Sequence, residues 1–315
     1  MVALGGGHGL AATLKALRRV TDQLTAVVGV ADDGGSSGRL RAEFGVLPPG
    51  DLRMALAALC RDDTWGQTWS AVVQHRFTGT GELAGHSLGN LLITALWEQT
   101  EDAVKGLDWV AALLEAHGRV LPCSTVPLLI VADVEGLDPN APREVTVVRG
   151  QEAVATTAGR ILSIRLEPED PPACAEAVAA IREAEAIVMG PGSWYTSVIP
   201  HLLIPDLASS IVNSSAKRIV VLNLDPHHDK EMSGLPVDVH LSLLGGAAPG
   251  LRIDSVIADP DHVDDIPALT RVCEYFGAEL LLHRVSYSPL QNDAFASRAG
   301  EHDPEALSSA FALVL

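Results

Sequence analysis

Residues 31–40 read Ala-Asp-Asp-Gly-Gly-Ser-Ser-Gly-Arg-Leu, and they follow a short apolar segment, residues 24–30, that is typical of a buried strand. Small and acidic residues bury little apolar surface, so hydrophobic packing does not explain this stretch. It supplies flexible backbone, N–H groups, two hydroxyls and two carboxylates at one edge of a sheet. The pattern therefore indicates a nucleotide site in an α/β fold.

The start of the chain has the same order of strand, glycine turn and helix. Residues 2–4 are apolar, residues 5–9 read Gly-Gly-Gly-His-Gly, and a helical pattern begins at Leu10. Such a turn lets the backbone approach a ligand and directs the first helical N–H groups toward a phosphate. The Rossmann pattern G-x-G-x-x-G is incomplete because Leu10 holds the third position, and no Walker lysine supports a P-loop ATPase. Asp32 and Asp33 end the next strand, where a Rossmann-like fold offers a carboxylate to a ribose hydroxyl.

A third small-residue cluster, residues 190–197, reads Gly-Pro-Gly-Ser-Trp-Tyr-Thr-Ser and follows the apolar segment 187–189. It falls on the carboxyl edge of the sheet, where open α/β sheets bind ligands. Its N–H and hydroxyl groups are candidate phosphate donors, and Tyr195 is a candidate contact for a base or sugar. The alternative is a Pro-Gly turn in which Trp194 and Tyr195 pack as local core.

Together with three further motifs, these residues resemble the YvcK proteins, the bacterial gluconeogenesis-factor branch of the CofD/YvcK superfamily. The resemblance covers nearly the whole chain and rests on residues 5–10, 31–40, 48–53, 74–77, 85–92 and 190–197. It implies a Rossmann-like fold and a cytoplasmic protein that binds UDP-sugars, with UDP-N-acetylglucosamine as the expected ligand. It also implies a link to growth on gluconeogenic carbon sources, to cell-wall precursor supply and to cell shape.

Two of these motifs have both a structural and a functional interpretation. Asp51 is a good helix cap, while Arg53 is able to pair with a phosphate or carboxylate. Taken alone, His86 is a structural histidine before a helix, but the resemblance implies that His86 and Asn90 face the site. Met54 replaces an Asn of the Bacillus-type members, which puts a polar contact at that position in doubt.

In the resulting hypothesis the glycine loops hold a diphosphate, the acidic pair takes the ribose hydroxyls, and residues 36–39 close over the ligand. The predicted ligand-binding residues are Gly6, Gly7, His8, Gly9, Asp32, Asp33, Gly35, Ser36, Ser37, Arg39, Asp51, Arg53, His86, Asn90, Gly190, Pro191, Gly192, Ser193, Tyr195, Thr196 and Asn223.

The amino-acid composition argues against some classes of binding partner. The 315 residues suffice for one large core, and a formal net charge of −18 disfavours nucleic acid and anionic membranes, which both select basic surfaces. The four cysteines are far apart and form no CxxC pair, so we expect reduced core thiols in a cytoplasmic protein. No apolar run is long enough to span a bilayer, which argues against membrane insertion.

Apolar strand patterns alternate with helical patterns, which predicts a doubly wound, mostly parallel α/β sheet in one domain, residues 1–315. A β-rich subdomain is expected at about residues 119–168. Predicted helices cover residues 52–59, 87–97, 108–117, 173–183, 195–203, 266–276 and 304–315. Predicted strands cover residues 126–131, 144–148, 161–166, 186–189, 218–224, 253–258 and 280–283.

The sequence contains only weak indications of a metal-binding site. Asp32 and Asp33 are candidate oxygen ligands for Mg²⁺ against a diphosphate. The run His227-His228-Asp229 looks like a ligand cluster, but no second histidine follows at helical spacing, which favours a solvated loop. No cofactor is otherwise indicated.

Three functions remain open at this level. The leading hypothesis is a regulatory UDP-sugar-binding protein whose bound state is sensed by a protein partner. A homodimer of this chain is compatible with that hypothesis. The first alternative is a CofD-like 2-phospho-L-lactate transferase. CofD proteins carry Gly-Pro-Ser-Asn-Pro where residues 190–194 read Gly-Pro-Gly-Ser-Trp, which weakens that alternative. An NAD(P)-dependent oxidoreductase rests on fold analogy alone.

Overall fold

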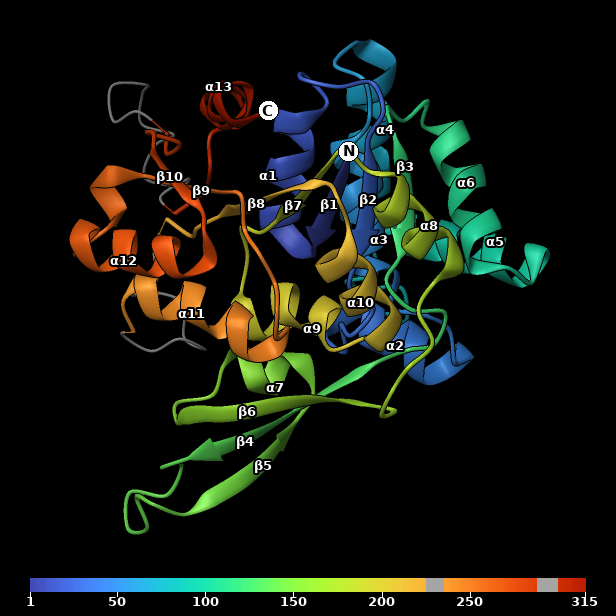
Figure 1. Cartoon of the computed structure of the whole chain (residues 1–315). Coiled ribbons are helices and arrows are strands. Elements are labelled where there is room, and N and C mark those ends of the chain that lie inside the picture. The colour runs from blue at the N-terminus through green and yellow to red at the C-terminus, as the bar shows by residue number, and fades with distance from the viewer. Residues whose placement is uncertain (225–234, 288–299) are drawn as a thin grey trace.

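A seven-stranded parallel sheet forms the centre of the computed structural model, which describes residues 1–224, 235–287 and 300–315 (Figure 1). Every strand pairing in this sheet is parallel. Most of its strands are short apolar runs buried on both faces, as parallel sheets require. In spatial order the strands are β10 (Glu279–Leu282), β9 (Ser255–Ala258), β8 (Lys217–Val221), β7 (Ala186–Met189), β1 (Val2–Gly5), β2 (Thr25–Val28) and β3 (Arg119–Pro122).

The strand order reverses between β1 and β7. From β1 the chain adds β2 and β3 on one side, while β7, β8, β9 and β10 follow one another on the other side. Because crossovers between parallel strands are right-handed, this reversal sends the connecting helices to opposite faces of the sheet. The carboxyl ends of β1 and β7 therefore flank the crevice in which doubly wound folds bind ligands. The predicted fold class is confirmed.

Four of the larger helices begin at an aspartate that caps them. The Asp63, Asp102, Asp265 and Asp303 carboxylates each accept a backbone N–H in the first turn of the helix that follows. The larger helices are α1 (Gly7–Leu17), α2 (Gly35–Phe44), α3 (Pro49–Ala58), α4 (Thr64–Gln74), α5 (Leu88–Thr100), α6 (Ala103–Leu113), α8 (Ala175–Glu183), α10 (Pro205–Asn213), α11 (Val237–Ala247), α12 (Ile266–Phe276) and α13 (Pro304–Val314).

Several of the predicted boundaries were wrong. The strand predicted at residues 126–131 is β4 (Leu129–Glu135). The helix predicted at residues 108–117 is α6, which starts five residues earlier because Asp102 caps it and ends at Leu113. The helix predicted at 195–203 is split into a π-helical turn, η1 (Trp194–Val198), and a short α9 (Ile199–Leu202).

The interpretation of residues 31–40 as flexible backbone is corrected in part. Residues 35–40 belong to α2, which follows Gly34 and ends before Gly45, where the backbone turns left-handed with φ 67°. Leu40 is buried, and the Ser36 and Ser37 side chains are buried with it. A regular helix explains this burial, because small side chains let α2 lie close to its neighbours.

A small antiparallel sheet lies beside the main body (Figure 1). Its strands, in spatial order, are β5 (Val145–Arg149), β4 (Leu129–Glu135) and β6 (Arg160–Glu167). The short helix α7 (Gln151–Ala155) follows β5 and packs against η1, which brings it close to the edge of the main sheet. The segment β3, inside the range predicted as β-rich, pairs with β2 in the main sheet instead.

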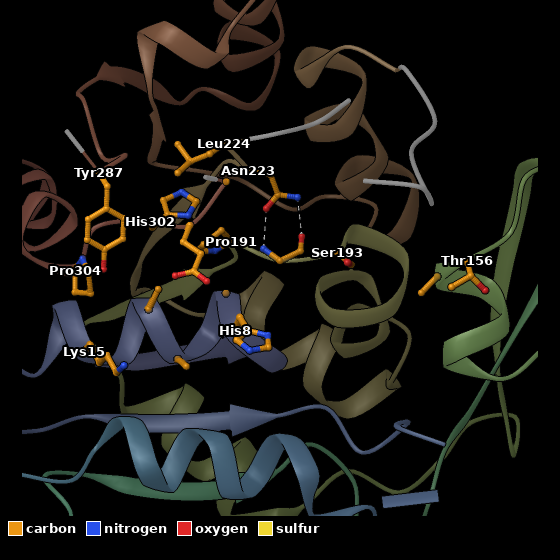
Figure 2. A pocket seen from close by; sticks show the side chains of 17 residues that line it. His8, Lys15, Thr156, Pro191, Ser193, Asn223, Leu224, Tyr287, His302 and Pro304 are labelled. Carbon is orange, nitrogen blue, oxygen red and sulfur yellow. Dashed lines mark hydrogen bonds between the residues drawn. The ribbon is translucent and has the colours of Figure 1, made fainter. Parts of the chain in front are cut away.

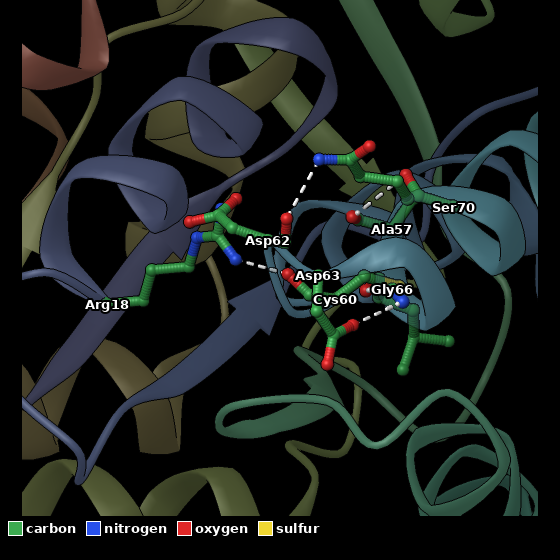
Figure 3. Close-up of polar contacts among 9 residues, drawn as sticks. Arg18, Ala57, Cys60, Asp62, Asp63, Gly66 and Ser70 are labelled. Carbon is green, nitrogen blue, oxygen red and sulfur yellow. Dashed lines mark hydrogen bonds and ion pairs between the residues drawn. The ribbon is translucent and has the colours of Figure 1, made fainter.

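The end of α1 is tied to the loop between α3 and α4 (Figure 3). The Arg18 guanidinium donates to the Cys60 carbonyl and to the Asp62 carboxylate. In the same loop the Asp63 carboxylate accepts the Gly66 N–H at 2.9 Å. These contacts fix the direction of α1, which carries the first glycine turn at its other end.

The expectations about the cysteines and about membrane-spanning segments are compared here with the described residues. The four cysteines are free and buried. Among the helices that the structure describes, none is both long and apolar enough to cross a bilayer.

Candidate functional site

A cavity of about 650 Å³ opens at the carboxyl ends of β1, β7 and β8 (Figure 2). We call it the cleft. Of the predicted ligand-binding residues, six line it: His8, Gly9, Pro191, Gly192, Ser193 and Asn223. The other lining residues are Ala11, Ala12, Lys15, Ala155, Thr156, Leu224, Tyr287, Gly300, Glu301, His302 and Pro304.

Two glycine loops meet at the floor of the cleft. A Cβ atom added to Gly9 would lie 2.2 Å from the Pro191 carbonyl oxygen, so only glycine permits this approach of α1 to the loop after β7. The Thr13 hydroxyl donates to the Gly190 carbonyl at 3.1 Å and holds the two segments together. The loops therefore converge because of residue size and one buried hydrogen bond.

Asn223, after β8, fixes the shape of the second loop. Its side-chain oxygen accepts the Gly192 N–H at 2.8 Å, and its amide nitrogen donates to the Gly192 carbonyl at 3.0 Å (Figure 2). Both polar ends of the side chain are thus used by the protein. Asn223 lines the cleft, but its role in this structure is to position Gly192.

The charged and aromatic residues of the cleft were missed by the sequence analysis. Lys15 and Tyr287 lie at one end of the cavity and Thr156 at the other (Figure 2). Lys15 follows Gly9, Ala11 and Ala12 on one face of α1, a helical spacing that was available in the sequence as a signal. Tyr287 comes from a distant segment, and the sequence holds no local signal for it.

His302 lines the cleft as a neutral side chain. Its Nε2 atom is 3.1 Å from the Leu222 carbonyl, and burial lowers the pKa of its imidazole to about 4. Because an acceptor carbonyl faces Nε2, this nitrogen carries the proton. His302 therefore ties the start of α13 to the segment after β8.

A second group of predicted residues lies together outside the cleft lining, between the N-terminal ends of α2, α3 and α5. We call it the buried polar cluster: Asp32, Ser36, Ser37, Asp51, Arg53, His86 and Asn90. The Ser37 hydroxyl accepts the Gly50 N–H at 3.0 Å. The Ser36 hydroxyl accepts from the Asn90 amide at 3.0 Å and lies 2.9 Å from His86 Nδ1.

Asp51 connects the cluster to α1. Its carboxylate accepts the Gly7 N–H, and a Cβ atom added to Gly6 would lie 2.4 Å from Asp51 Oδ2. The prediction that this residue caps its own helix was wrong, because Asp51 lies inside the first turn of α3 and faces the start of α1. One N–H group expected to point at a phosphate is thus already bonded to the protein's own carboxyl.

Burial raises the pKa of the Asp51 carboxyl to about 7, and the nearby Asp32 carboxylate adds to this effect. The Gly7 N–H and the Arg53 guanidinium oppose it. A carboxyl group with this pKa changes its charge near neutral pH, which makes Asp51 the most sensitive charge of the cluster.

Arg53 is 4% exposed, yet it has no hydrogen bond or ion pair within the described residues. Burial and the positive charge of Arg76 lower the pKa of its guanidinium to about 10, while the nearby Asp51 and Asp32 carboxylates oppose this shift. Ser87 Oγ and Asn90 Oδ1, on the first turn of α5, are also buried without a partner in the described structure.

Other predicted residues lie elsewhere. The Asp33 carboxylate accepts the Glu152 N–H at 3.1 Å and so contacts α7. The Arg39 guanidinium donates to the carbonyls of Glu82 at 3.3 Å and Ala84 at 2.8 Å, instead of closing over the cleft. Gly35 opens α2 with a φ of 46°. None of these three lines the cleft.

Trp194 and Tyr195 pack in the core, which was the alternative to a ligand contact for this pair. Trp194 is 1% exposed and Tyr195 is 7% exposed, and both belong to the hydrophobic core. Thr196 is buried beside them. Tyr195 does not line the cleft, because the π-helical turn directs it inward. Tyr287 provides the aromatic ring of the cleft instead.

Metal ligation has little support among the described residues. No group of three or more His, Cys, Asp or Glu side chains there is placed to hold a metal ion. Asp32 Oδ1 accepts the Gly34 N–H at 3.0 Å, which uses one of its oxygens. Residues 227–229 lie outside the described residues.

A doubly wound sheet with a ligand-sized cleft at its reversal point defines a Rossmann-like α/β protein. The family model described as "2-phospho-L-lactate transferase CofD" matches residues 1–271. A "Putative gluconeogenesis factor" of Mycobacterium tuberculosis (strain ATCC 25618 / H37Rv) is 53% identical over 263 residues, 84% of this chain and 76% of that protein. The "Gluconeogenesis factor" of Halalkalibacterium halodurans is 35% identical over 266 residues, 84% of this chain and 79% of that protein.

A comparison with solved structures supports the same family assignment. The crystal structure of a member of the UPF0052 family from Bacillus halodurans aligns with a TM-score of 0.83 and 29% identity, covering 99% of this chain and 97% of that chain. The chain belongs to the CofD/YvcK family, and its curated relatives carry the name gluconeogenesis factor.

Proposed function

We propose that the cleft binds a UDP-sugar, with UDP-N-acetylglucosamine as the expected ligand, and that a protein partner senses the bound state. The observation that carries this proposal is the meeting of the Gly9 and Pro191 loops at the reversal point of the sheet, with Lys15 and Tyr287 at one end of the cavity. In the relatives, the name gluconeogenesis factor refers to carbon metabolism.

The chemistry of the cleft suits a nucleotide diphosphate. The first turn of α1 borders it at His8 and Gly9, where a helix dipole favours negative charge. Lys15 adds a full positive charge, and Tyr287 offers a ring on which a base can stack. The cavity of about 650 Å³ falls in the range of ~300–1,000 Å³ typical of small-molecule sites.

Local groups outweigh the net charge of −18. Exposed charges farther away than a Debye length of ~8 Å are largely screened, so the acidic surface opposes a bound diphosphate only weakly. The groups that decide affinity are the cationic and N–H donors that line the cleft.

The test is isothermal titration with UDP-N-acetylglucosamine, UDP-glucose, GDP and NAD. We expect heat with the UDP-sugars and a Lys15→Gln variant with roughly tenfold weaker affinity, about 1.4 kcal/mol. Lys105→Gln, at an exposed position of α6, is the matched control and should bind as the wild type. A folded protein that gives no heat with any UDP-sugar overturns the proposal.

A CofD-like transferase is the second candidate, favoured by the family match over residues 1–271. Purified protein incubated with a deazaflavin alcohol, a nucleotide-diphosphate donor and Mg²⁺ tests it directly. Formation of the phospholactyl product would make the enzyme the leading function. Binding of the UDP-sugar without any such product supports the regulatory one.

A further inference from the structure

The outer edge of β5 pairs with no other strand of the described structure. In the spatial order of the small sheet, β5 lies at one end and pairs with β4 on its inner side. The Gly150 N–H, directly after β5, donates to the Ile130 carbonyl of β4 at 2.9 Å. Because the backbone groups of an antiparallel strand face one neighbour at alternate residues, Val145, Val147 and Arg149 direct their N–H and C=O groups outward. These groups are open to a further strand.

The central residues of β5 carry none of the usual protection of a free edge. Natural sheets blunt such an edge with lysine, proline or a β-bulge. Residues 145–148 read Val-Thr-Val-Val, and the irregularity of this sheet lies between β4 and β6 instead. Val145 is 50% exposed and Val147 is 49% exposed, and alternation places both on one face of the strand. An exposed β-branched edge of this kind is suited to pairing with another chain.

The charge of the small sheet indicates which kind of chain. Its three strands contain three arginines and three carboxylates, so their formal charges cancel, although the whole chain carries −18. The ion pairs are Arg149 with Glu167, Arg160 with Glu135, and Arg165 with Asp133. A surface without net charge offers little attraction to a strongly acidic or basic partner, and it favours association with a copy of itself.

The position of the small sheet also lets two copies meet. The sheet projects from the main body, and β5 lies on the side away from the large sheet (Figure 1). Two copies that join at β5 would therefore keep their acidic main bodies apart. Since exposed charges farther apart than a Debye length of ~8 Å are largely screened, repulsion between the two bodies opposes this contact only weakly.

We propose that β5 pairs with β5 of a second copy of this chain, in an antiparallel, two-fold arrangement centred on Val147. In this register Val147 lies opposite Val147 of the partner subunit, and Val145 lies opposite Arg149 of the partner subunit. The outward-facing backbone groups then bond one another, and the two three-stranded sheets become one. Centring the pair on Thr146 would instead place Arg143 opposite Arg149, and like charges directly opposite each other are destabilising.

The test is sedimentation equilibrium over a concentration series up to about 1 mM protein. One strand pair is a small interface, so we expect the wild type to form a dimer in a concentration-dependent equilibrium. Val147→Lys and Val147→Glu each place like charges opposite each other on the two-fold axis, and each variant alone should dimerise roughly tenfold more weakly. An equimolar mixture of the two variants should dimerise again, because lysine then faces glutamate.

Leu162→Lys is the matched control. Leu162 belongs to β6, the strand at the other edge of the small sheet, and it is 44% exposed. The variant gains the same charge as Val147→Lys and should dimerise as the wild type. Equal weakening in Leu162→Lys and Val147→Lys would mean that added charge alone controls association, which overturns the proposal.

Three further outcomes would also overturn it. The first is a wild type that stays monomeric up to about 1 mM. The second is a dimer that persists unchanged in both Val147 variants alone, since another surface then forms it. The third is a mixture of the two variants that stays monomeric, because the strands then do not meet at Val147. Recovery in the mixture requires folded protein, so misfolding of one variant cannot imitate the expected result.

This inference does not depend on the proposed function, because the mass measurement uses no ligand and β5 does not line the cleft. A wild type that binds UDP-N-acetylglucosamine but stays monomeric rejects the β5 pairing alone. A wild type that dimerises through Val147 but binds no UDP-sugar rejects the proposed function alone.

Discussion

The cleft and the buried polar cluster arise from similar sequence, yet their polar groups are satisfied in opposite ways. In the cleft, Asn223 bonds Gly192, Thr13 bonds Gly190 and His302 bonds Leu222. In the cluster, Arg53 and Asn90 keep buried atoms that have no partner among the described residues, and so does Ser87 beside it.

This difference shows how each region treats its polar groups. The cleft is a preformed shape whose walls are held by internal hydrogen bonds, so a ligand there replaces solvent. The cluster holds unpaired groups in a buried place, which carries an electrostatic penalty. Gly6 and Asp51 join the two regions, because only glycine leaves room for the Asp51 carboxylate at the start of α1.

The largest effect that would sharpen the comparison is expected for Asp51→Asn. The Asp51 pKa is raised from 3.8 to about 7, so the folded state binds more protons than the unfolded state between those values. Stability therefore falls as pH rises through this window, by ~4 kcal/mol when complete. Asn keeps an oxygen to accept the Gly7 N–H but carries no charge.

Urea unfolding of wild type and Asp51→Asn should show similar free energies below about pH 4 and a growing advantage for the variant up to pH 8. The exposed Asp22→Asn variant serves as the control and should follow the wild type. A difference between wild type and Asp51→Asn that stays constant with pH would mean that the cluster carries no such electrostatic penalty.

The next largest effect concerns the cleft. Gly9→Ala places a Cβ atom 2.2 Å from the Pro191 carbonyl, so α1 and the loop after β7 must separate. We expect a loss of about 1–3 kcal/mol in unfolding free energy, typical of overpacking, together with loss of UDP-sugar binding. Thermal unfolding and titration measure both.

Gly246→Ala in α11 is the matched control, because an added Cβ meets nothing within 4 Å there. This helical replacement should stabilise the protein by ~0.4–1 kcal/mol. Should Gly9→Ala prove as stable and as competent in binding as the wild type, the two loops do not need their close approach.

Asn223→Ala should have an intermediate effect, mostly on the cleft. It removes two hydrogen bonds to Gly192, worth roughly 0.5–1.5 kcal/mol each, and releases the loop that borders the ligand. UDP-sugar affinity should fall about tenfold, measured by titration. Asn213→Ala at the exposed end of α10 is the control, and UDP-sugar affinity should be unchanged in that variant.

The fold was predictable because it depends on local patterns. Short apolar strands alternating with amphipathic helices identify a doubly wound sheet, and the glycine turns after β1 and β7 mark the edge where the cleft lies. The interpretation of residues 31–40 as flexible backbone failed from Gly35 onward, because small residues were taken as a sign of flexibility. In α2 they allow close packing, with Ser36 and Ser37 buried.

The division of the predicted residues into two groups was not predictable. Sequence motifs place Gly9, Asp51 and Asn90 near one sheet edge, but side-chain direction depends on tertiary packing. Nothing local indicates that Asp51 faces α1, or that Tyr287 replaces Tyr195 as the ring of the cleft. Contacts between segments distant in the sequence determine both the direction of Asp51 and the position of Tyr287.

The smallest effect is expected for Thr13→Val, which tests whether the cleft depends on its single α1-to-loop hydrogen bond. The variant keeps the β-branched shape but leaves the buried Gly190 carbonyl without the Thr13 hydroxyl, at a cost of ~1 kcal/mol in unfolding free energy. Thr270→Val in α12 is the control, because its hydroxyl bonds only within its own helix at Ile266. UDP-sugar affinity should fall a few-fold in Thr13→Val and stay constant in Thr270→Val. If both variants unfold and bind alike, Gly9 packing alone holds the loops, and the satisfied hydrogen bonds of the cleft follow from its shape instead of creating it.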